Sequence, residues 1–249
     1  MKIFHKAILA CATLALAALP ALAALPKLTF GCDATFPPME FRDANKKLVG
    51  FDIDMINAVA KAGGFEAVVK NTAWDGIFAG LAAGDYDGVL SSVTITNERK
   101  ATMDFSTPYV NAGQVIIVSK KTPGLTTLDK LKGKKVGVQI GTTGAIEVAK
   151  DKSITMKSYD EAGLAVEDLF IGRVDAVVID SPTAASYVLQ NDKYKGALMI
   201  SSPKPFTEEH YGIAVKKGNT KALELVNKGL AIVLKDGTVD KLAKKWLSK

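Results

Sequence analysis

Short β-rich apolar runs alternate with helical patterns along most of the 249-residue chain. The expected strands cover residues 27–32, 66–70, 88–91, 114–119, 135–139, 154–157, 176–179, 197–201 and 211–215. The expected helices cover residues 52–62, 74–83, 144–149, 161–171, 182–189, 221–234 and 239–247. Strands that alternate with helices favour an α/β architecture with mostly parallel pairing. The chain is long enough for one large domain or for two smaller ones.

One short pattern occurs twice and suggests two similar lobes. In both 84–92 and 172–180 a helix ends at a glycine, and the order Gly-x-x-Asp leads into an apolar strand. Glycine readily takes the left-handed conformation after a helix, and aspartate favours a turn. The equivalent ends of the two strands then carry Ser91-Ser92 and Asp180, where open α/β sheets bind ligands. A chance similarity between two helix-to-strand turns is the alternative.

Composition excludes several classes of protein and site. With 48% hydrophobic residues and a formal net charge of +6, the chain does not have the composition of a disordered protein. Its two cysteines, Cys11 and Cys32, cannot build a disulfide framework or a thiolate metal site, and we expect Cys32 to be buried and inert. With only His5 and His210, a His-rich metal centre is excluded. The lysines are dispersed among acidic residues, so we expect no nucleic-acid partner.

Residues 1–23 have the pattern of a secretory signal peptide. Two lysines precede an apolar run over 7–19, and the small residues up to Ala23 suit signal peptidase. We therefore expect cleavage before Ala24 and a periplasmic mature protein. The alternative of a membrane anchor is disfavoured because the run is shorter than the roughly 20 residues that span a bilayer. A lipoprotein site at Cys11 would leave too short an apolar stretch before the cysteine.

The loop 140–144 predicts a small anion site. It follows the expected strand 135–139, reads Ile-Gly-Thr-Thr-Gly and precedes a helix. Its backbone N–H groups and the hydroxyls of Thr142 and Thr143 therefore suit an anion. The P-loop lysine and the GxGxxG pattern are both missing from this loop, so we favour a carboxylate over a phosphate. A simple helix N-cap is the alternative.

Several stretches together carry a family resemblance. The first is GFDIDM at 50–55, followed by Val59-Ala60 and Gly63. The others are CDATFPPMEF at 32–41, WDGI at 74–77, SSVTITNERK at 91–100, DFS at 104–106, GT at 237–238 and KW at 245–246. Over essentially the whole mature chain, the sequence resembles the periplasmic solute-binding proteins that serve polar amino acid ABC transporters.

This resemblance implies two α/β lobes with a mixed sheet in each, joined by two crossover strands and closing on a ligand like a clam shell. The first lobe would be discontinuous, with residues 24–109 and 211–249. The second lobe would cover 110–210, with hinges near 109–113 and 207–211. The family also implies a membrane permease and an ATPase as partners, a monomer, and no cofactor or metal.

The resemblance assigns ligand-binding roles as well. Arg99 would bind the ligand α-carboxylate through a bidentate fork, helped by Thr94 and by Thr142-Thr143. Asp180 would accept from the α-ammonium, with Ser92 as a further acceptor, so that each lobe supplies one charged partner. The full set of expected ligand-binding residues is Asp33, Phe36, Trp74, Ser91, Ser92, Thr94, Arg99, Gln139, Thr142, Thr143 and Asp180.

The choice of amino acid depends on the side-chain end of this set. Aromatic walls from Phe36 and Trp74 together with the charge of Asp33 favour arginine or lysine. The same groups resemble those of glutamine-binding relatives, and Gln139 suits either ligand. Some glutamine-binding relatives have a histidine before the ammonium-binding aspartate, whereas this chain has Ile179. We therefore rank basic amino acids slightly ahead of glutamine, and acidic ones last because no second Arg or Lys falls in the matched pocket.

Two other function classes are open. A periplasmic dehydratase-type lyase would need a carboxylic acid with a raised pKa above a leaving hydroxyl, and Glu40 and Asp33 are the candidates. A ligand sensor would present the same fold to a kinase, but no membrane span or signalling domain follows Lys249. We expect a transport protein and not an enzyme.

Overall fold

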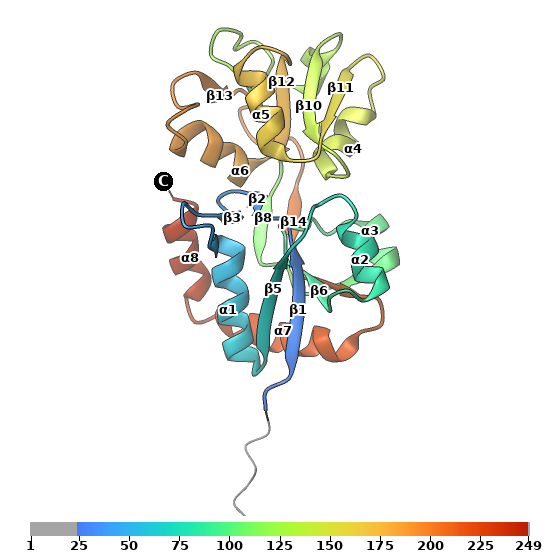
Figure 1. The fold of residues 1–249 in the computed structure, drawn as a ribbon. Helices are drawn as coiled ribbons and strands as arrows, with labels where there is room; N and C mark the ends of the chain where they lie inside the picture. Colours follow the sequence, from blue (N-terminus) through green and yellow to red (C-terminus); the bar gives the residue numbers. More distant parts are fainter. Residues whose placement is uncertain (1–23, 249) are drawn as a thin grey trace, which may run out of the picture.

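The computed structural model describes residues 24–248, which form two lobes with a mixed β-sheet in each (Figure 1). The expected signal peptide over residues 1–23 lies outside the described residues. Within the described part of the chain, no helix is both long and apolar enough to span a membrane. The two-lobed α/β architecture agrees with the expectation from the sequence.

The first lobe contains a five-stranded sheet with the order β5-β1-β6-β15-β7. β1 (Lys27–Cys32) pairs in parallel with β5 (Glu66–Asn71) and with β6 (Gly88–Val89). β15 (Ala214–Lys216) pairs antiparallel with β6 and with β7 (Met103–Phe105). The sheet therefore combines strands from the beginning and from the later part of the described chain.

Helices and a small second sheet complete this lobe. The helices are α1 (Phe51–Gly63), α2 (Ile77–Ala83), α3 (Asn97–Thr102), α7 (Thr220–Val233) and α8 (Thr238–Trp246). α1 packs against α7 and α8. The small antiparallel sheet consists of β2 (Thr35–Phe36), β3 (Glu40–Arg42) and β4 (Leu48–Val49).

α1 begins after Gly50, at a place where only glycine fits. Gly50 has a φ of +132°, and a Cβ there would lie 2.2 Å from the carbonyl oxygen of Met39. The N–H groups of Phe51 and Asp52 donate to the carbonyls of Pro38 and Met39 at 3.0 and 2.8 Å. This close approach fixes the first turn of α1 against the segment that leads into β3.

The second lobe contains a five-stranded sheet with the order β11-β10-β12-β9-β13. β10 (Lys135–Gln139) pairs in parallel with β11 (Thr155–Tyr159) and with β12 (Ala176–Asp180). β9 (Gln114–Ser119) pairs antiparallel with β12 and with β13 (Leu198–Ile200). The helical elements are η1 (Leu128–Leu131), α4 (Thr143–Ala149), α5 (Ala162–Phe170), α6 (Ser181–Ala185) and the π-helical turn η2 (Ser186–Gln190).

Two short strands connect the lobes. β8 (Val110–Ala112) and β14 (Glu209–Tyr211) pair antiparallel and run between the two large sheets (Figure 1). Tyr211 is fully buried, and its backbone carbonyl accepts from the N–H of Tyr109 at 3.0 Å. The hydroxyl of Tyr211 donates to Asp180 at 2.8 Å, so this connection is hydrogen-bonded to the central strand of the second lobe.

The structure differs from the sequence-based expectation in pairing and in some elements. Parallel pairing does not dominate, because each large sheet contains two antiparallel strand pairs beside its two parallel ones. The strand expected over 211–215 is divided between β14 and β15. The helix expected from Trp74 begins only at Ile77, because a turn precedes it. Cys32, at the end of β1, is a buried free thiol as predicted.

Candidate functional site

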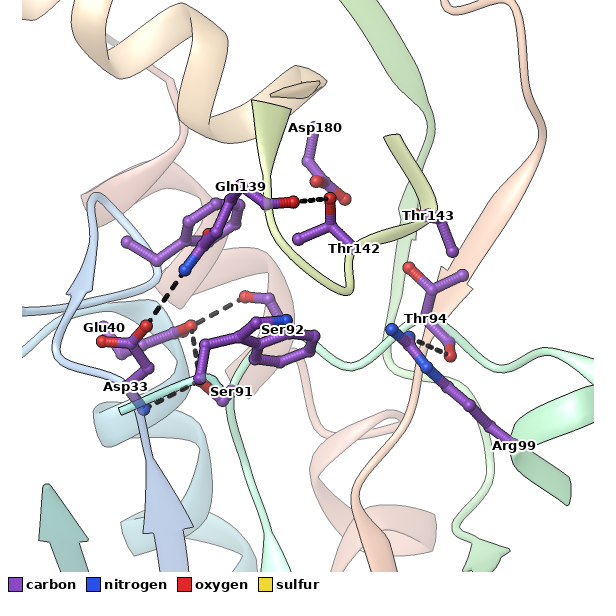
Figure 2. Close-up of a pocket in the computed structure, with 12 residues that line it drawn as sticks. Asp33, Glu40, Ser91, Ser92, Thr94, Arg99, Gln139, Thr142, Thr143 and Asp180 are labelled. Atoms are coloured by element: carbon purple, nitrogen blue, oxygen red, sulfur yellow. Dashed lines mark hydrogen bonds between the residues drawn. The ribbon is translucent and has the colours of Figure 1, made fainter. Parts of the chain in front are cut away.

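A pocket of about 330 Å³, partly open to solvent, lies between the two lobes. Its lining contains every ligand-binding residue predicted from the sequence, together with one residue that was not in that set, Glu40. Figure 2 shows Asp33, Glu40 and Ser91 at one end of the pocket, and Thr94 and Arg99 at the other. The lining residues are Asp33, Phe36, Glu40, Trp74, Ser91, Ser92, Thr94, Arg99, Gln139, Thr142, Thr143 and Asp180.

Arg99, on α3, is held in place without an acidic partner. Its guanidinium donates to the carbonyl of Thr94 at 2.9 Å and, across the gap between the lobes, to the carbonyl of Gly141 at 3.3 Å. Its Cζ lies 5.5 Å from the ring centroid of Trp74 and 5.0 Å from that of Phe78. Burial lowers the pKa of Arg99, while the charges of acidic residues nearby raise it. Among residues 24–248 the guanidinium forms no ion pair, so it is available to an incoming carboxylate.

Asp180 is the acidic counterpart in the second lobe. It ends β12 and stands at the N-cap position of α6, but its side chain makes no capping hydrogen bond. Instead one carboxylate oxygen accepts from the hydroxyl of Tyr211 at 2.8 Å. Burial, and then the negative charge of Glu209, raises the pKa of Asp180 to about 6. A buried carboxylate of this kind favours a cationic guest.

The threonine hydroxyls that were expected to face an anion already have partners. Thr142 caps α4: its hydroxyl accepts from the N–H of Ala145 and donates to the carbonyl of Gln139. The hydroxyls of Thr94 and Thr143 both donate to Glu209, at 2.7 and 2.8 Å. The simple N-cap therefore exists at this loop, and any anion there would depend on backbone N–H groups.

Glu209 was missed by the sequence analysis. It lies on β14 between the lobes, is buried, and also accepts from the hydroxyl of Thr207 at 2.8 Å. The amide of Gln114 lies 3.4 Å from its second oxygen. Apart from Thr207, these partners come from distant parts of the sequence, so no local pattern identifies them.

At the opposite end of the pocket, the side-chain amide of Gln139 in the second lobe is hydrogen-bonded to Asp33 in the first. Gln139 of β10 donates through Nε2 to Asp33 at 3.2 Å and to the carbonyl of Asp160 at 3.0 Å. The other carboxylate oxygen of Asp33 accepts from the hydroxyl of Thr35 at 2.8 Å. Burial raises the pKa of Asp33, and the two side-chain hydrogen bonds oppose that rise. This end therefore offers an acidic group that a side chain with N–H donors can satisfy.

Apolar and hydroxyl side chains form the remaining walls. Phe36 and Trp74 are buried, and Trp74 packs edge to face on Phe78 at a centroid distance of 5.1 Å. The hydroxyls of Ser91 and Ser92 both donate to the carboxyl of Glu40, each at 3.1 Å (Figure 2). The described residues contain no cluster of three or more His, Cys, Asp or Glu side chains that could hold a metal ion.

Known proteins resemble this chain in both sequence and fold. Residues 28–249 match the model for bacterial extracellular solute-binding proteins, family 3. A probable histidine-binding protein of Neisseria gonorrhoeae is 39% identical over 100% of this chain and 97% of the relative. The L-cystine-binding protein TcyJ of Escherichia coli K12 is 37% identical over 88% of this chain and 82% of the relative.

A solved structure shares the fold at higher identity. An ancestral arginine-binding protein bound to glutamine is 46% identical, with a TM-score of 0.84 over 90% of this chain and 98% of that chain. The family match covers both lobes and nearly all described residues. The chain therefore belongs to family 3 of the bacterial extracellular solute-binding proteins.

Proposed function

We propose that this protein captures a polar L-amino acid between its lobes and delivers it to the permease and ATPase of an ABC importer. One observation carries the proposal: Arg99 from the first lobe and Asp180 from the second line the same pocket. Neither makes an ion pair with another residue of the described chain. A zwitterion supplies one carboxylate for Arg99 and one ammonium for Asp180, so a single ligand satisfies both charges.

The side chain of the ligand is basic or carries an amide. Asp33 and Gln139 meet at the far end of the pocket, where the carboxylate accepts N–H donors. No second Arg or Lys lines the pocket, which disfavours acidic ligands. The names of the relatives include histidine, cystine, arginine and glutamine, all of them polar. We rank arginine and lysine ahead of glutamine because Phe36 and Trp74 line the pocket and would attract a cation through their rings.

Closure would proceed about β8 and β14, with residues 109–113 and 207–211 as the two hinges. The first lobe then consists of 24–109 and 211–249, and the second of 110–210. Glu209 would serve this motion because it accepts from hydroxyls of both lobes. The mature protein would act as a periplasmic monomer after removal of residues 1–23.

Binding without catalysis fits the pocket better than lyase chemistry. A lyase would need a carboxylic acid in contact with the leaving group. Glu40, one candidate, has no exposed surface, and both its oxygens are occupied by serine hydroxyls. Asp33, the other candidate, is held between Thr35 and Gln139.

A thermal-shift screen tests the proposal. Purified protein, freed of co-purified ligand, is heated with each of the common L-amino acids, with L-cystine and with L-ornithine. A ligand at 100 times its Kd stabilises the folded state by about 2.7 kcal/mol, which raises the unfolding midpoint by several degrees. We expect shifts with arginine and lysine or with glutamine, and none with aspartate or glutamate. If no L-amino acid raises the midpoint, the proposed function is wrong.

A further inference from the structure

Two carboxyl groups meet in the interior directly behind the pocket. Glu40 on β3 and Asp52 in the first turn of α1 have no exposed surface, and both accept hydrogen bonds from Ser92, Glu40 from its hydroxyl and Asp52 from its backbone N–H. The contact follows from the tight passage at Gly50, which fixes the start of α1 against the residues that precede β3. Only Glu40 of the two lines the pocket.

Among the described residues, the side chains and N–H groups that donate hydrogen bonds to this pair are all neutral. Glu40 accepts from the hydroxyls of Ser91 and Ser92, at 3.1 Å each. Asp52 accepts from the backbone N–H of Ser92 at 2.9 Å and from the hydroxyl of Tyr109, 2.9 and 2.8 Å from its two oxygens. Within residues 24–248, no Lys, Arg or His forms a hydrogen bond or an ion pair with either carboxyl.

The other titratable groups that face the pair carry no positive charge either. They are Cys32 at the end of β1, Tyr109 before β8 and Tyr211 on β14. Burial raises the pKa of each, and negative charge adds to the rise, from both members of the pair at Cys32 and Tyr109 and from Asp180 and Glu40 at Tyr211. Two ionised carboxylates in contact, buried and without a cation, repel each other strongly. One of the two carboxyls can therefore be ionised at this buried position, but ionisation of both is strongly unfavourable.

We propose that Glu40 and Asp52 retain one proton between them and act as a positioning pair that fixes Ser91 and Ser92 at the pocket. The part of this inference that concerns ligand affinity rests on the proposed function. The shared proton does not, because it follows from the two buried carboxyls alone.

The pair determines what the serines present to a ligand. Ser92 has a φ of +49°, an uncommon conformation for a residue with a side chain, and the bond from its N–H to Asp52 holds it there. Both serine hydroxyls donate to Glu40, and Ser91 Oγ also accepts from the N–H of Asp33 at 3.0 Å. One lone pair of Ser91 and those of Ser92 are therefore left to accept. This part of the pocket then favours ligand side chains that donate N–H groups and disfavours those that accept.

The shared proton also links stability to pH. Burial raises the pKa of Asp52 to about 6 and that of Glu40 well above its usual range. Between the pKa of an aspartate or glutamate in the unfolded chain, roughly 4, and the higher folded value, the folded protein holds a proton that the unfolded chain has lost. Stability therefore falls as pH rises through this window. One such proton changes the unfolding equilibrium by up to tenfold per pH unit.

Four proteins test the inference: the wild type, Glu40→Gln, Glu40→Met and the control Asp54→Asn. Glutamine replaces the shared proton with a permanent N–H, whereas methionine fills the volume without an acceptor. Asp54 lies on α1, as Asp52 does, but it accepts hydrogen bonds from Lys245 and Trp246 and does not line the pocket. Unfolding without ligand is measured from pH 5 to 8, and binding of the amino acid identified by the screen is measured by calorimetry at pH 7.

In the wild type, the shared proton should change the unfolding equilibrium constant by up to tenfold per pH unit. We expect Glu40→Gln to lose this contribution and Asp54→Asn to keep all of it. We expect Glu40→Gln to bind the amino acid at least tenfold more tightly than Glu40→Met. A wild-type pH dependence in Glu40→Gln would show that no proton is shared. Equal affinities of the two Glu40 variants would show that the pair does not position the serines.

The two arms separate this inference from the proposed function. If the unfolding arm gives the expected result but no amino acid binds the wild type, the shared proton stands and both the proposed function and the positioning role are wrong. If Glu40→Met does not fold, binding is compared between Glu40→Gln and Ser92→Ala, since the loss of a positioned hydroxyl should weaken binding more than the amide replacement does. Equal binding of these two variants would overturn the positioning role.

Discussion

In each lobe a helix is followed by a glycine in the left-handed conformation, and an aspartate then leads into a central strand. The glycines are Gly84 and Gly172, with φ of +91° and +79°. The carboxylate of Asp87 accepts from the N–H of Thr29 at 2.8 Å, and that of Asp175 accepts from the N–H of Lys135 at 2.8 Å. These matched hydrogen bonds confirm the repeat predicted from the sequence.

The same comparison shows where the lobes differ. The segment after β6 carries Ser91 and Ser92, whereas the equivalent β12 ends in Asp180. Among the described residues, the one arginine that lines the pocket, Arg99, belongs to the first lobe. The repeated part of each lobe is thus its scaffold, and the chemistry at the strand ends is not repeated. Opposite charges on two similar scaffolds favour a ligand that carries both charges and that holds the lobes together.

Removal of the first-lobe charge should have the largest effect. We expect Arg99→Ala to weaken binding of every amino acid ligand by about 2–5 kcal/mol, because it removes the partner of a desolvated carboxylate. Calorimetry on the folded variant measures the loss. The matched control is Arg173→Ala in the second lobe, where the side chain is 70% exposed and pairs with Asp168. Affinity of the Arg99 variant within threefold of the wild type would contradict its role.

Removal of the second-lobe charge should weaken binding and also prevent closure. Under the proposed function, the ligand of Asp180→Asn would keep its carboxylate partner in the first lobe but would lose the ammonium partner that favours the closed form. We expect an affinity loss of roughly 10–100-fold and little compaction at saturation. Small-angle scattering with and without ligand measures the radius of gyration. Compaction of the variant equal to that of the wild type would show that Asp180 does not hold the lobes together.

The pH dependence gives an independent check of the same residue. The pKa of Asp180 in the ligand-free protein is raised to about 6. An ammonium prefers the ionised carboxylate, so wild-type affinity should fall as pH drops below about 6, approaching tenfold per pH unit. Asp180→Asn should lose this part of the dependence. An unchanged profile in the variant would assign the titration to another group.

The ring of Trp74 has two expected roles: it contacts Arg99, and it forms a wall of the pocket. Trp74 and Phe78 both lie against Arg99, but only Trp74 lines the pocket. We expect Phe78→Leu to weaken all ligands alike through a less fixed arginine. Trp74→Leu should do the same and, in addition, weaken arginine or lysine relative to glutamine by about 0.5–2 kcal/mol. Equal losses for these ligands in Trp74→Leu would remove the reason for ranking basic amino acids first.

The sequence predicted most strands of the two large sheets and missed those of the small sheet. β9 and β10 were predicted to the residue because an apolar run in a central strand has clear limits. β2, β3 and β4 contain only two or three residues each, too few to show a period. The site residues predicted from the family motifs all line one pocket, and their roles in ligand binding stay predictions.

Residues that act through distant partners could not be predicted in this way. Glu209 accepts from side chains of both lobes, and none of those contacts lies in a local sequence pattern except Thr207. Asp52 was recognised as part of a motif, but its contact with Glu40 depends on the path of the chain at Gly50. Such contacts depend on tertiary packing, which periodicity and spacing do not specify.

The smallest effect should come from the repeated turn itself. Asp87→Ala and Asp175→Ala each remove a hydrogen bond to a strand N–H, worth about 0.5–1.5 kcal/mol of stability. Asp87 is half-buried and Asp175 is exposed, so water can replace the lost bond more easily in the second lobe. We expect both variants to lower the free energy of unfolding in urea, the Asp87 variant more, and neither to change ligand affinity by more than threefold. Because both turns lie away from the pocket lining, a large affinity loss in either variant would show that the scaffold and the strand ends are not independent.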